Sequence, residues 1–137
     1  MISIGVDCEE IERFQKIIDD RKFLERIFTP NEIEYCFSRA DPKKHLAARF
    51  CAKEAMVKAL SHRKVEARVE NIEILNDANG VPMVKVNLDD TNDLVMQVSL
   101  SHSNSVAFAQ AIVYDKRIRI NEIHEANKMM EGHHSIS

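Results

Sequence analysis

The chain has 137 residues and a formal net charge of −3, with 45% hydrophobic and 30% charged residues. These values are typical of one soluble globular domain with a real core, and they exclude a disordered chain. The charge argues against a general nucleic-acid binder, and no apolar run is long enough to span a membrane. The first residues lack the basic start and long apolar stretch of a signal peptide, so we expect a cytoplasmic protein.

The first half of the chain predicts one short strand followed by helices. Residues 2–6 are apolar or β-branched and predict a buried strand that ends at Asp7. Residues 9–20 have helical spacing, with apolar side chains on one side. Thr29 and Glu32 enclose a proline at the first helical position, which predicts a capped helix to about residue 37. Asp41 before Pro42 predicts the start of a long helix that reaches about residue 60.

The second half predicts strands at about residues 71–75, 81–86, 95–100 and 106–113, with turns at 76–80 and 102–105. In the last strand one face carries only small residues and a valine, and the long helix is equally rich in small residues. We expect these two surfaces to pack closely. The predicted fold is α+β, with a long buried helix packed on a mostly antiparallel sheet. Residues 1–114 form the domain, and residues 115–137 form a C-terminal extension that is helical or frayed and has no assigned role.

Charged side chains within the long helix are the most informative feature of the sequence. Between Leu46 and Leu60 the helix is apolar or small nearly all the way round, yet it carries Arg49, Lys53, Glu54 and Lys58. Their i, i+4 spacing is compatible with ordinary helix-face contacts. However, no polar stripe exists for them to share, and buried charges are costly unless they are paired or bound. A site for a metal ion and phosphate groups is therefore the preferred interpretation.

Acidic residues near the end of the first strand are the second candidate. Asp7 is compatible with a turn or helix-cap residue, but strand ends are also where ligands gather in α/β arrangements. Asp7, Glu54 and, as a third ligand, Glu9 offer a set of carboxylate oxygens suited to Mg²⁺. They cannot complete its coordination, so phosphate oxygens and waters would supply the rest.

Ser101 and His102 are the third candidate, at the predicted turn after residue 100. A surface turn is the simple interpretation, whereas hydroxyls, a histidine and turn amides also suit phosphate binding. The three cysteines (Cys8, Cys36 and Cys51) have no C-x-x-C spacing, so reduced and mostly buried thiols are expected. A thiol or serine hydrolase that uses Cys51 or Ser101 is a further alternative, but the sequence has no G-x-S-x-G nucleophile elbow.

Three segments, in order, carry a family resemblance. They are Ile4-Gly5-Val6-Asp7 with Glu10-Ile11-Glu12-Arg13, then Arg49-Phe50-Cys51-Ala52-Lys53-Glu54-Ala55-Met56-Val57-Lys58-Ala59-Leu60, and finally Ser99-Leu100-Ser101-His102. Over residues 1–114 the chain resembles the 4'-phosphopantetheinyl transferases, specifically the single-domain holo-acyl-carrier-protein synthases. The resemblance implies that fold and a Mg²⁺-dependent transfer of phosphopantetheine from coenzyme A to a serine of an apo acyl carrier protein, with release of 3',5'-ADP.

The resemblance also implies roles for the residues singled out above. Asp7 and Glu54 match magnesium ligands, and Lys58 matches a lysine that contacts the phosphates. Ser101 and His102 match the motif that holds the nucleotide phosphates, with Arg49 and Lys53 as further basic candidates. The general base is open between Glu54 and a water that it orients. Members of the family are typically homotrimers with active sites between subunits.

The expected protein partner is an acidic acyl carrier protein. Basic residues that could dock it follow the first strand, although acidic residues are interleaved and a mixed-charge solvated face is equally compatible. These residues are Arg13, Lys16, Arg21, Lys22 and Arg26.

The sequence departs from the family at residues 61–64, where a glycine-rich turn is usual, and at Glu9, which is usually apolar. The altered turn leaves open a second function, a binding module for coenzyme A or nucleotide phosphates without turnover.

Overall fold

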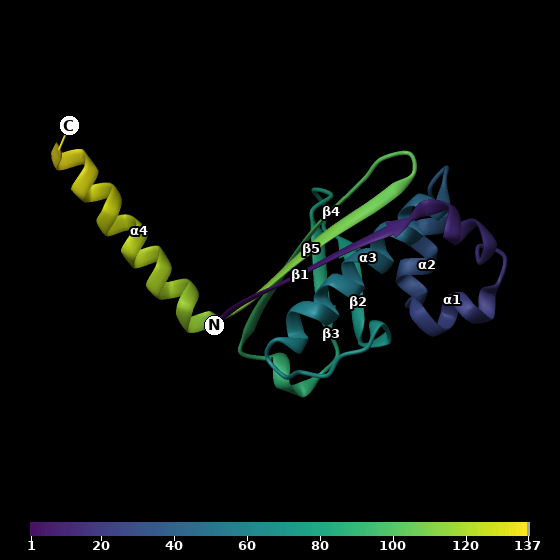
Figure 1. Cartoon of the computed structure of the whole chain (residues 1–137), viewed down its shortest axis with the longest axis horizontal. Coiled ribbons are helices and arrows are strands. Elements are labelled where there is room, and N and C mark those ends of the chain that lie inside the picture. Colours follow the sequence, from purple (N-terminus) through teal and green to yellow (C-terminus); the bar gives the residue numbers. More distant parts are fainter. Residues whose placement is uncertain (137) are drawn as a thin grey trace.

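The computed structural model describes residues 1–136, with the side chains of residues 118–123 and 133–136 left out of the description. A three-stranded antiparallel sheet, a separate β-hairpin and two short helices surround one long helix (Figure 1). The strands are β1 (Ile2–Glu10), β2 (Ile72–Asn76), β3 (Pro82–Val86), β4 (Leu94–His102) and β5 (Val106–Asp115). The α-helices are α1 (Arg21–Ile27), α2 (Pro30–Phe37), α3 (Pro42–Ser61) and α4 (Lys116–Ile136), and the 3-10 helices are η1 (Ile11–Lys16), η2 (Val69–Asn71) and η3 (Asp89–Thr91).

The predicted packing of the long helix on the last strand is confirmed. The large sheet has the order β1-β5-β4, and α3 covers one of its faces. The small inward residues of β5 are almost completely buried, as are the small residues of α3 that face them. The Cys51 thiol donates a hydrogen bond to the Ala107 carbonyl, with 3.3 Å between sulfur and oxygen. The α+β class with a long buried helix on antiparallel strands is therefore correct.

The contact between β1 and α3 depends on Gly5. A Cβ atom added to Gly5 would lie 1.8 Å from the Ala55 carbonyl oxygen and 2.7 Å from the Ala59 nitrogen. Both of these are backbone atoms, which cannot rotate away. The strand and the helix thus touch backbone to backbone, and this contact fixes where Asp7, two residues further along β1, meets α3.

Gly5→Ala is accordingly expected to push β1 away from α3 and to lower the free energy of unfolding by about 3 kcal/mol or more, at the upper end of overpacking effects. Urea unfolding would measure the loss. Gly132→Ala is a suitable control, because a Cβ there meets no described atom within 4 Å. Equal stability of the two variants would show that the backbone contact is looser than in this structure.

Two local expectations from the sequence were wrong, and one short helix was missed. The first strand does not end at Asp7 but continues to Glu10, because every residue of β1 pairs with β5 up to Glu10 opposite Val106. The expected helix over residues 9–20 is only the 3-10 helix η1, where the i, i+3 spacing of Ile11 and Phe14 buries both side chains. A separate helix, α1, follows, and Asp20 caps it by accepting the Phe23 N–H at 3.1 Å.

The predicted capping box at the start of α2 is confirmed. Thr29 Oγ1 accepts the Glu32 N–H at 3.2 Å, and Glu32 Oε1 accepts the Thr29 N–H at 2.8 Å. Helix α3 begins at Pro42 as expected, but the Asp41 side chain makes no cap hydrogen bond. Helix α4 leaves the end of β5 and projects away from the rest of the molecule (Figure 1). Within residues 1–136, no helix combines the length and apolar character that a bilayer crossing requires.

Candidate active site

Carboxylates from β1 and α3 meet at one edge of the large sheet. Alternation along β1 places Asp7 and Glu9 on the face that α3 covers, and both are half-buried. The i, i+4 spacing on α3 places Glu54 and Lys58 beside them. Lys58 Nζ donates to Asp7 Oδ1 at 3.1 Å and to the Val6 carbonyl oxygen at 3.0 Å. Residues about fifty positions apart in sequence thus form one charged cluster.

The charges of this cluster act on one another. Burial raises the pKa of Glu54, and the neighbouring Asp7 raises it further, while Lys58 lowers it. Burial likewise raises the pKa of Glu9, with Asp7 adding to the effect and Arg13 opposing it. Asp7 Oδ2 is buried and has no hydrogen-bond partner among the described residues. A buried carboxylate oxygen without a donor is costly, and a cation placed against it would remove that cost.

The cluster fits a magnesium ion that is only partly held by protein. No three His, Cys, Asp or Glu side chains in the described part of the chain converge closely enough to hold a metal by themselves. Glu9 is engaged by Arg13, with 2.9 Å between Glu9 Oε2 and Arg13 Nη1. Asp7 and Glu54 remain, and one or two carboxylates completed by waters and substrate phosphates is the usual environment of protein-bound Mg²⁺.

A polar cavity lies between α3 and β4, at the opposite edge of the sheet from β1. Its volume is about 390 Å³, and Arg49, His45, Ser101 and His102 contribute to its lining, whereas Asp7, Glu54 and Lys58 do not. Arg49 is 2% exposed, and its Nε and Nη2 have no hydrogen-bond partner among the described residues. Its guanidinium carbon lies 4.0 Å from the centre of the Tyr35 ring. A buried, unpaired guanidinium facing a cavity is suited to an anion.

The structure places Lys53 neither in the carboxylate cluster nor in the cavity beside Arg49. Its ammonium is completely buried, 2.5 Å from Glu32 Oε1 and 2.6 Å from the Ile27 carbonyl oxygen. Glu32 Oε2 in turn accepts the Ile74 N–H at 2.8 Å. Burial lowers the pKa of Lys53, and the attraction of Glu32 opposes this. Lys53 therefore joins α2, α3 and β2 inside the core, and we leave it out of the proposed ligand-binding set.

The basic residues expected to dock a carrier protein lie on η1 and α1. Arg13 pairs with Glu9, and Arg21 pairs with Glu25 at 3.2 Å. Lys16, Lys22 and Arg26 are exposed and have no ion-pair partner among the described side chains. Two of these five basic residues are thus already paired within the chain. Arg13 also borders an apolar cavity of about 130 Å³ lined by Phe14, Phe23 and Phe50.

Reasoning from sequence missed His45 and Tyr35. The His45 ring centre lies 5.8 Å from that of Tyr35 and 6.2 Å from that of His102. One signal could have found His45, because it precedes Arg49 by four residues on the predicted helix and so shares its face. Tyr35 had no such signal, since it comes from α2 and reaches the cavity only through tertiary packing.

The cysteines do not support a thiol hydrolase. Burial raises the pKa of Cys36 and of Cys51 to about 12, so both thiols stay protonated near neutral pH. Cys51 is also engaged with the Ala107 carbonyl. The expectation of reduced, mostly buried thiols is correct for these two, while Cys8 is exposed.

Comparison with known proteins identifies the family. Residues 3–112 match the sequence model of the 4'-phosphopantetheinyl transferase superfamily. The holo-[acyl-carrier-protein] synthase of Thermodesulfovibrio yellowstonii is 41% identical over 112 residues, which cover 80% of this chain and 96% of that protein. The synthase of Protochlamydia amoebophila is 43% identical over 116 residues, covering 79% and 95%.

Solved structures give the same result. The Bacillus anthracis holo-(acyl-carrier-protein) synthase in complex with CoA (3',5'-ADP) superposes with a TM-score of 0.69 at 32% identity, covering 83% of this chain and 96% of that one. The Helicobacter pylori synthase in complex with coenzyme A has a TM-score of 0.69 at 28% identity, covering 81% and 99%. The chain belongs to the 4'-phosphopantetheinyl transferase superfamily. Within it, the chain is an enzyme of the single-domain holo-acyl-carrier-protein synthase type.

Proposed function

We propose that this enzyme transfers 4'-phosphopantetheine from coenzyme A to a serine of an apo acyl carrier protein, in a Mg²⁺-dependent reaction that releases 3',5'-ADP. The observation that carries the proposal is the cluster of Asp7, Glu54 and Lys58, in which a buried Asp7 carboxylate oxygen accepts no hydrogen bond from the described residues. It provides anionic ligands for a metal and a cation for a phosphate within one small volume. Residues 1–114 would form the catalytic unit.

Each residue of the cluster has a role in this proposal. Asp7 and Glu54 would hold Mg²⁺, which neutralises charge on the diphosphate when it is bound, and Glu9 is a further candidate ligand if it exchanges Arg13 for the metal. Lys58 is 53% exposed at its side chain, so its ammonium is free to turn toward a phosphate oxygen. Phosphoryl transfer needs mainly positioning and electrostatic stabilisation, which these charges supply. The serine proton would go to Glu54 or to a water that it orients.

Arg49, Ser101 and His102 would hold the nucleotide end of coenzyme A. Nε and Nη2 of the buried Arg49 guanidinium donate no hydrogen bond to any described residue, and His102 and Ser101 add donors from the end of β4. The diphosphate has to reach the carboxylate cluster, which lies outside this cavity. We therefore assign the cavity to the 3'-phosphate.

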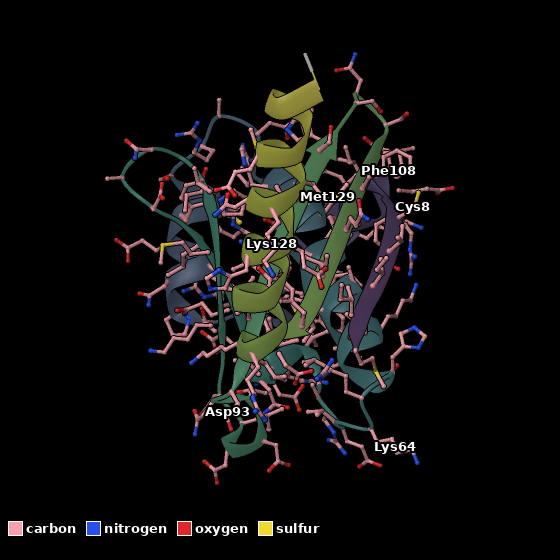
Figure 2. All side chains as sticks on the ribbon, turned by 90° about the vertical axis from the view of Figure 1, so that its left-hand side faces the viewer. Cys8, Lys64, Asp93, Phe108, Lys128 and Met129 are labelled. Atoms are coloured by element: carbon pink, nitrogen blue, oxygen red, sulfur yellow. The ribbon has the colours of Figure 1, made fainter. Side chains whose placement is uncertain are left out.

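A homotrimer with shared active sites would bring the two groups together. Strand β5 separates them in one chain, since Asp7 on β1 and Leu100 on β4 both pair with Ala109. The outer face of the sheet carries exposed apolar side chains, among them Ile4, Val6 and Phe108, which are about half exposed. Figure 2 shows Phe108 and Cys8 together on this face. Sedimentation of the purified protein would determine the assembly.

An acidic acyl carrier protein would be the second substrate, in the cytoplasm. The residues proposed to dock it are Arg13, Lys16, Arg21, Lys22 and Arg26. Electrostatic steering of this kind would make the association rate fall as salt rises. The apolar cavity beside Arg13 would accept an apolar side chain of the carrier.

Mass measurement of the carrier tests the proposed reaction. The enzyme is incubated with coenzyme A, Mg²⁺ and several apo carrier proteins, and each carrier is weighed before and after. We expect the mass of one phosphopantetheine to be added, and the addition to stop when EDTA removes the metal. Binding of coenzyme A without modification of any carrier would instead establish the binding module without turnover.

The conformation of the turn after α3 weakens the case for a binding module without turnover. Residues 61–64 lack the glycine that is usual for the family, yet Lys64 has φ of 60°, in the left-handed region that glycine favours. The lysine therefore adopts a conformation of the glycine type at the cost of some backbone strain. The absence of glycine at this turn is thus no argument against turnover.

A further inference from the structure

His45 occupies an unusual place in the Arg49 cavity. It lies on α3 one helical turn before Arg49 and is half-buried. Its ring is close to the rings of Tyr35 on α2 and His102 on β4, with an edge-to-face arrangement toward each. The described lining of the cavity contains no carboxylate, so every ionisable group that could carry charge there at neutral pH is basic.

Burial and the charges around His45 disfavour its protonation. Burial lowers the pKa of His45 most, and Arg49, Arg39 and His102 lower it further, while Asp41 raises it. These groups face His45 from α3, from β4 and from the segment before α3, and the phenol of Tyr35 on α2 is a further titratable group beside it. A phosphate dianion beside Arg49 would reverse the balance, because it cancels the guanidinium charge and adds negative charge next to the imidazole.

We propose that His45 is a proton-coupled phosphate-binding residue, which takes up one proton from solvent when the 3'-phosphate of coenzyme A enters the Arg49 cavity. The imidazole then becomes an imidazolium that donates a hydrogen bond to a phosphate oxygen. The step forms one N–H bond on the imidazole and breaks one bond to hydrogen in the hydronium ion or buffer acid that supplies the proton. This inference rests on the proposed function for the identity of the ligand, but not on turnover.

The sign of the pH dependence follows from linkage. A group that is more easily protonated in the complex than in the free enzyme strengthens binding as pH falls. The gain begins as pH falls through the pKa of His45 in the complex and ends at its lower pKa in the free enzyme. If the two differ by one unit, affinity gains about tenfold across that window.

Titration calorimetry with adenosine 3',5'-bisphosphate as the probe tests the proposal. Binding to the whole enzyme is measured between pH 6 and pH 8.5, in two buffers with different heats of ionisation, which reports the protons taken up. His45→Phe keeps an aromatic ring at the position but cannot titrate. His62→Phe is the matched control, because it removes an exposed histidine beyond the other end of α3. Circular dichroism checks the fold of each variant, and His45→Gln serves if phenylalanine disturbs it.

We expect the wild type and His62→Phe to take up more protons than His45→Phe, and the affinity advantage over His45→Phe to grow about tenfold as pH falls from 8.5 to 6. Titration of the probe itself is common to all three proteins and cancels in the comparison. Adenosine 5'-monophosphate, which lacks the 3'-phosphate, should show no difference among them.

Equal proton uptake by wild type and His45→Phe would overturn the inference, and so would failure of the wild type to bind the bisphosphate. The carrier-mass experiment separates the two proposals. Modification of a carrier together with unchanged proton uptake in His45→Phe would leave the transferase function standing and remove His45 from phosphate binding.

Discussion

Glu54→Gln is expected to lower the rate of Mg²⁺-dependent transfer to the carrier by about 10³-fold, the scale at which removal of one electrostatic contact to a transition state is felt. The substitution keeps the size and hydrogen-bonding shape of the side chain but removes the charge that, with Asp7, would hold the metal. Rates are measured at saturating coenzyme A and carrier, and Mn²⁺ binding is measured by calorimetry. The transfer rate and the affinity for Mn²⁺ should both fall.

Glu54→Gln should raise the stability of the folded protein while it lowers the activity. The folded-state pKa of Glu54 is raised by burial and by Asp7, so ionising this carboxyl costs stability above its unfolded pKa. The glutamine variant avoids that cost and should be at least as stable as the wild type at pH 7. The difference should vanish as pH falls below the unfolded pKa of glutamate.

A matched control is available on α2. Glu34 is an exposed helical glutamate, and Glu34→Gln should leave both activity and stability unchanged. Full turnover in Glu54→Gln would remove Glu54 from the active site. A loss of activity accompanied by unfolding would contradict the expected separation of function from stability.

Lys53→Met is expected to lower the free energy of unfolding by about 3–5 kcal/mol. Lys53 and Glu32 are both completely buried, and Glu32 is further tied to the backbone at Thr29 and Ile74. Removing the lysine leaves a buried carboxylate without its counter-charge, which is far more costly than losing a solvated pair. Urea unfolding at a fixed protein concentration measures the effect, because an oligomer would make stability depend on concentration.

A second variant distinguishes charge from packing. Lys53→Met combined with Glu32→Gln removes the uncompensated charge, although the amide keeps an acceptor for only one of the two backbone N–H groups, so it should recover part of the lost stability. Arg21→Met breaks the exposed pair with Glu25 and should change stability little. If Lys53→Met costs no more than Arg21→Met, the buried pair is not a determinant of stability.

Several features could be predicted from the sequence because they depend on residues close together in the chain. The capping box at Thr29 and Glu32 depends only on residues three positions apart, and the structure has it. The small residues alternating along β5 predicted a close contact with α3, because alternation fixes a strand face regardless of what covers it. The boundaries of β1 and η1 were wrong, since they depend on pairing with β5, nearly a hundred residues away.

The four charged residues of α3 show which properties can be predicted from the sequence and which depend on tertiary packing. The order of residues alone shows that these charges lie on an apolar helix without a polar stripe and therefore need partners, and its motifs indicate the family. Which partner each charge has depends on how α3 packs against the other elements. Lys53 is paired within the core, Arg49 faces a cavity with His45, and Glu54 and Lys58 meet Asp7. The physical reason is that a buried charge is stabilised by whatever lies within a few ångströms, and helix packing, not chain position, sets that neighbourhood.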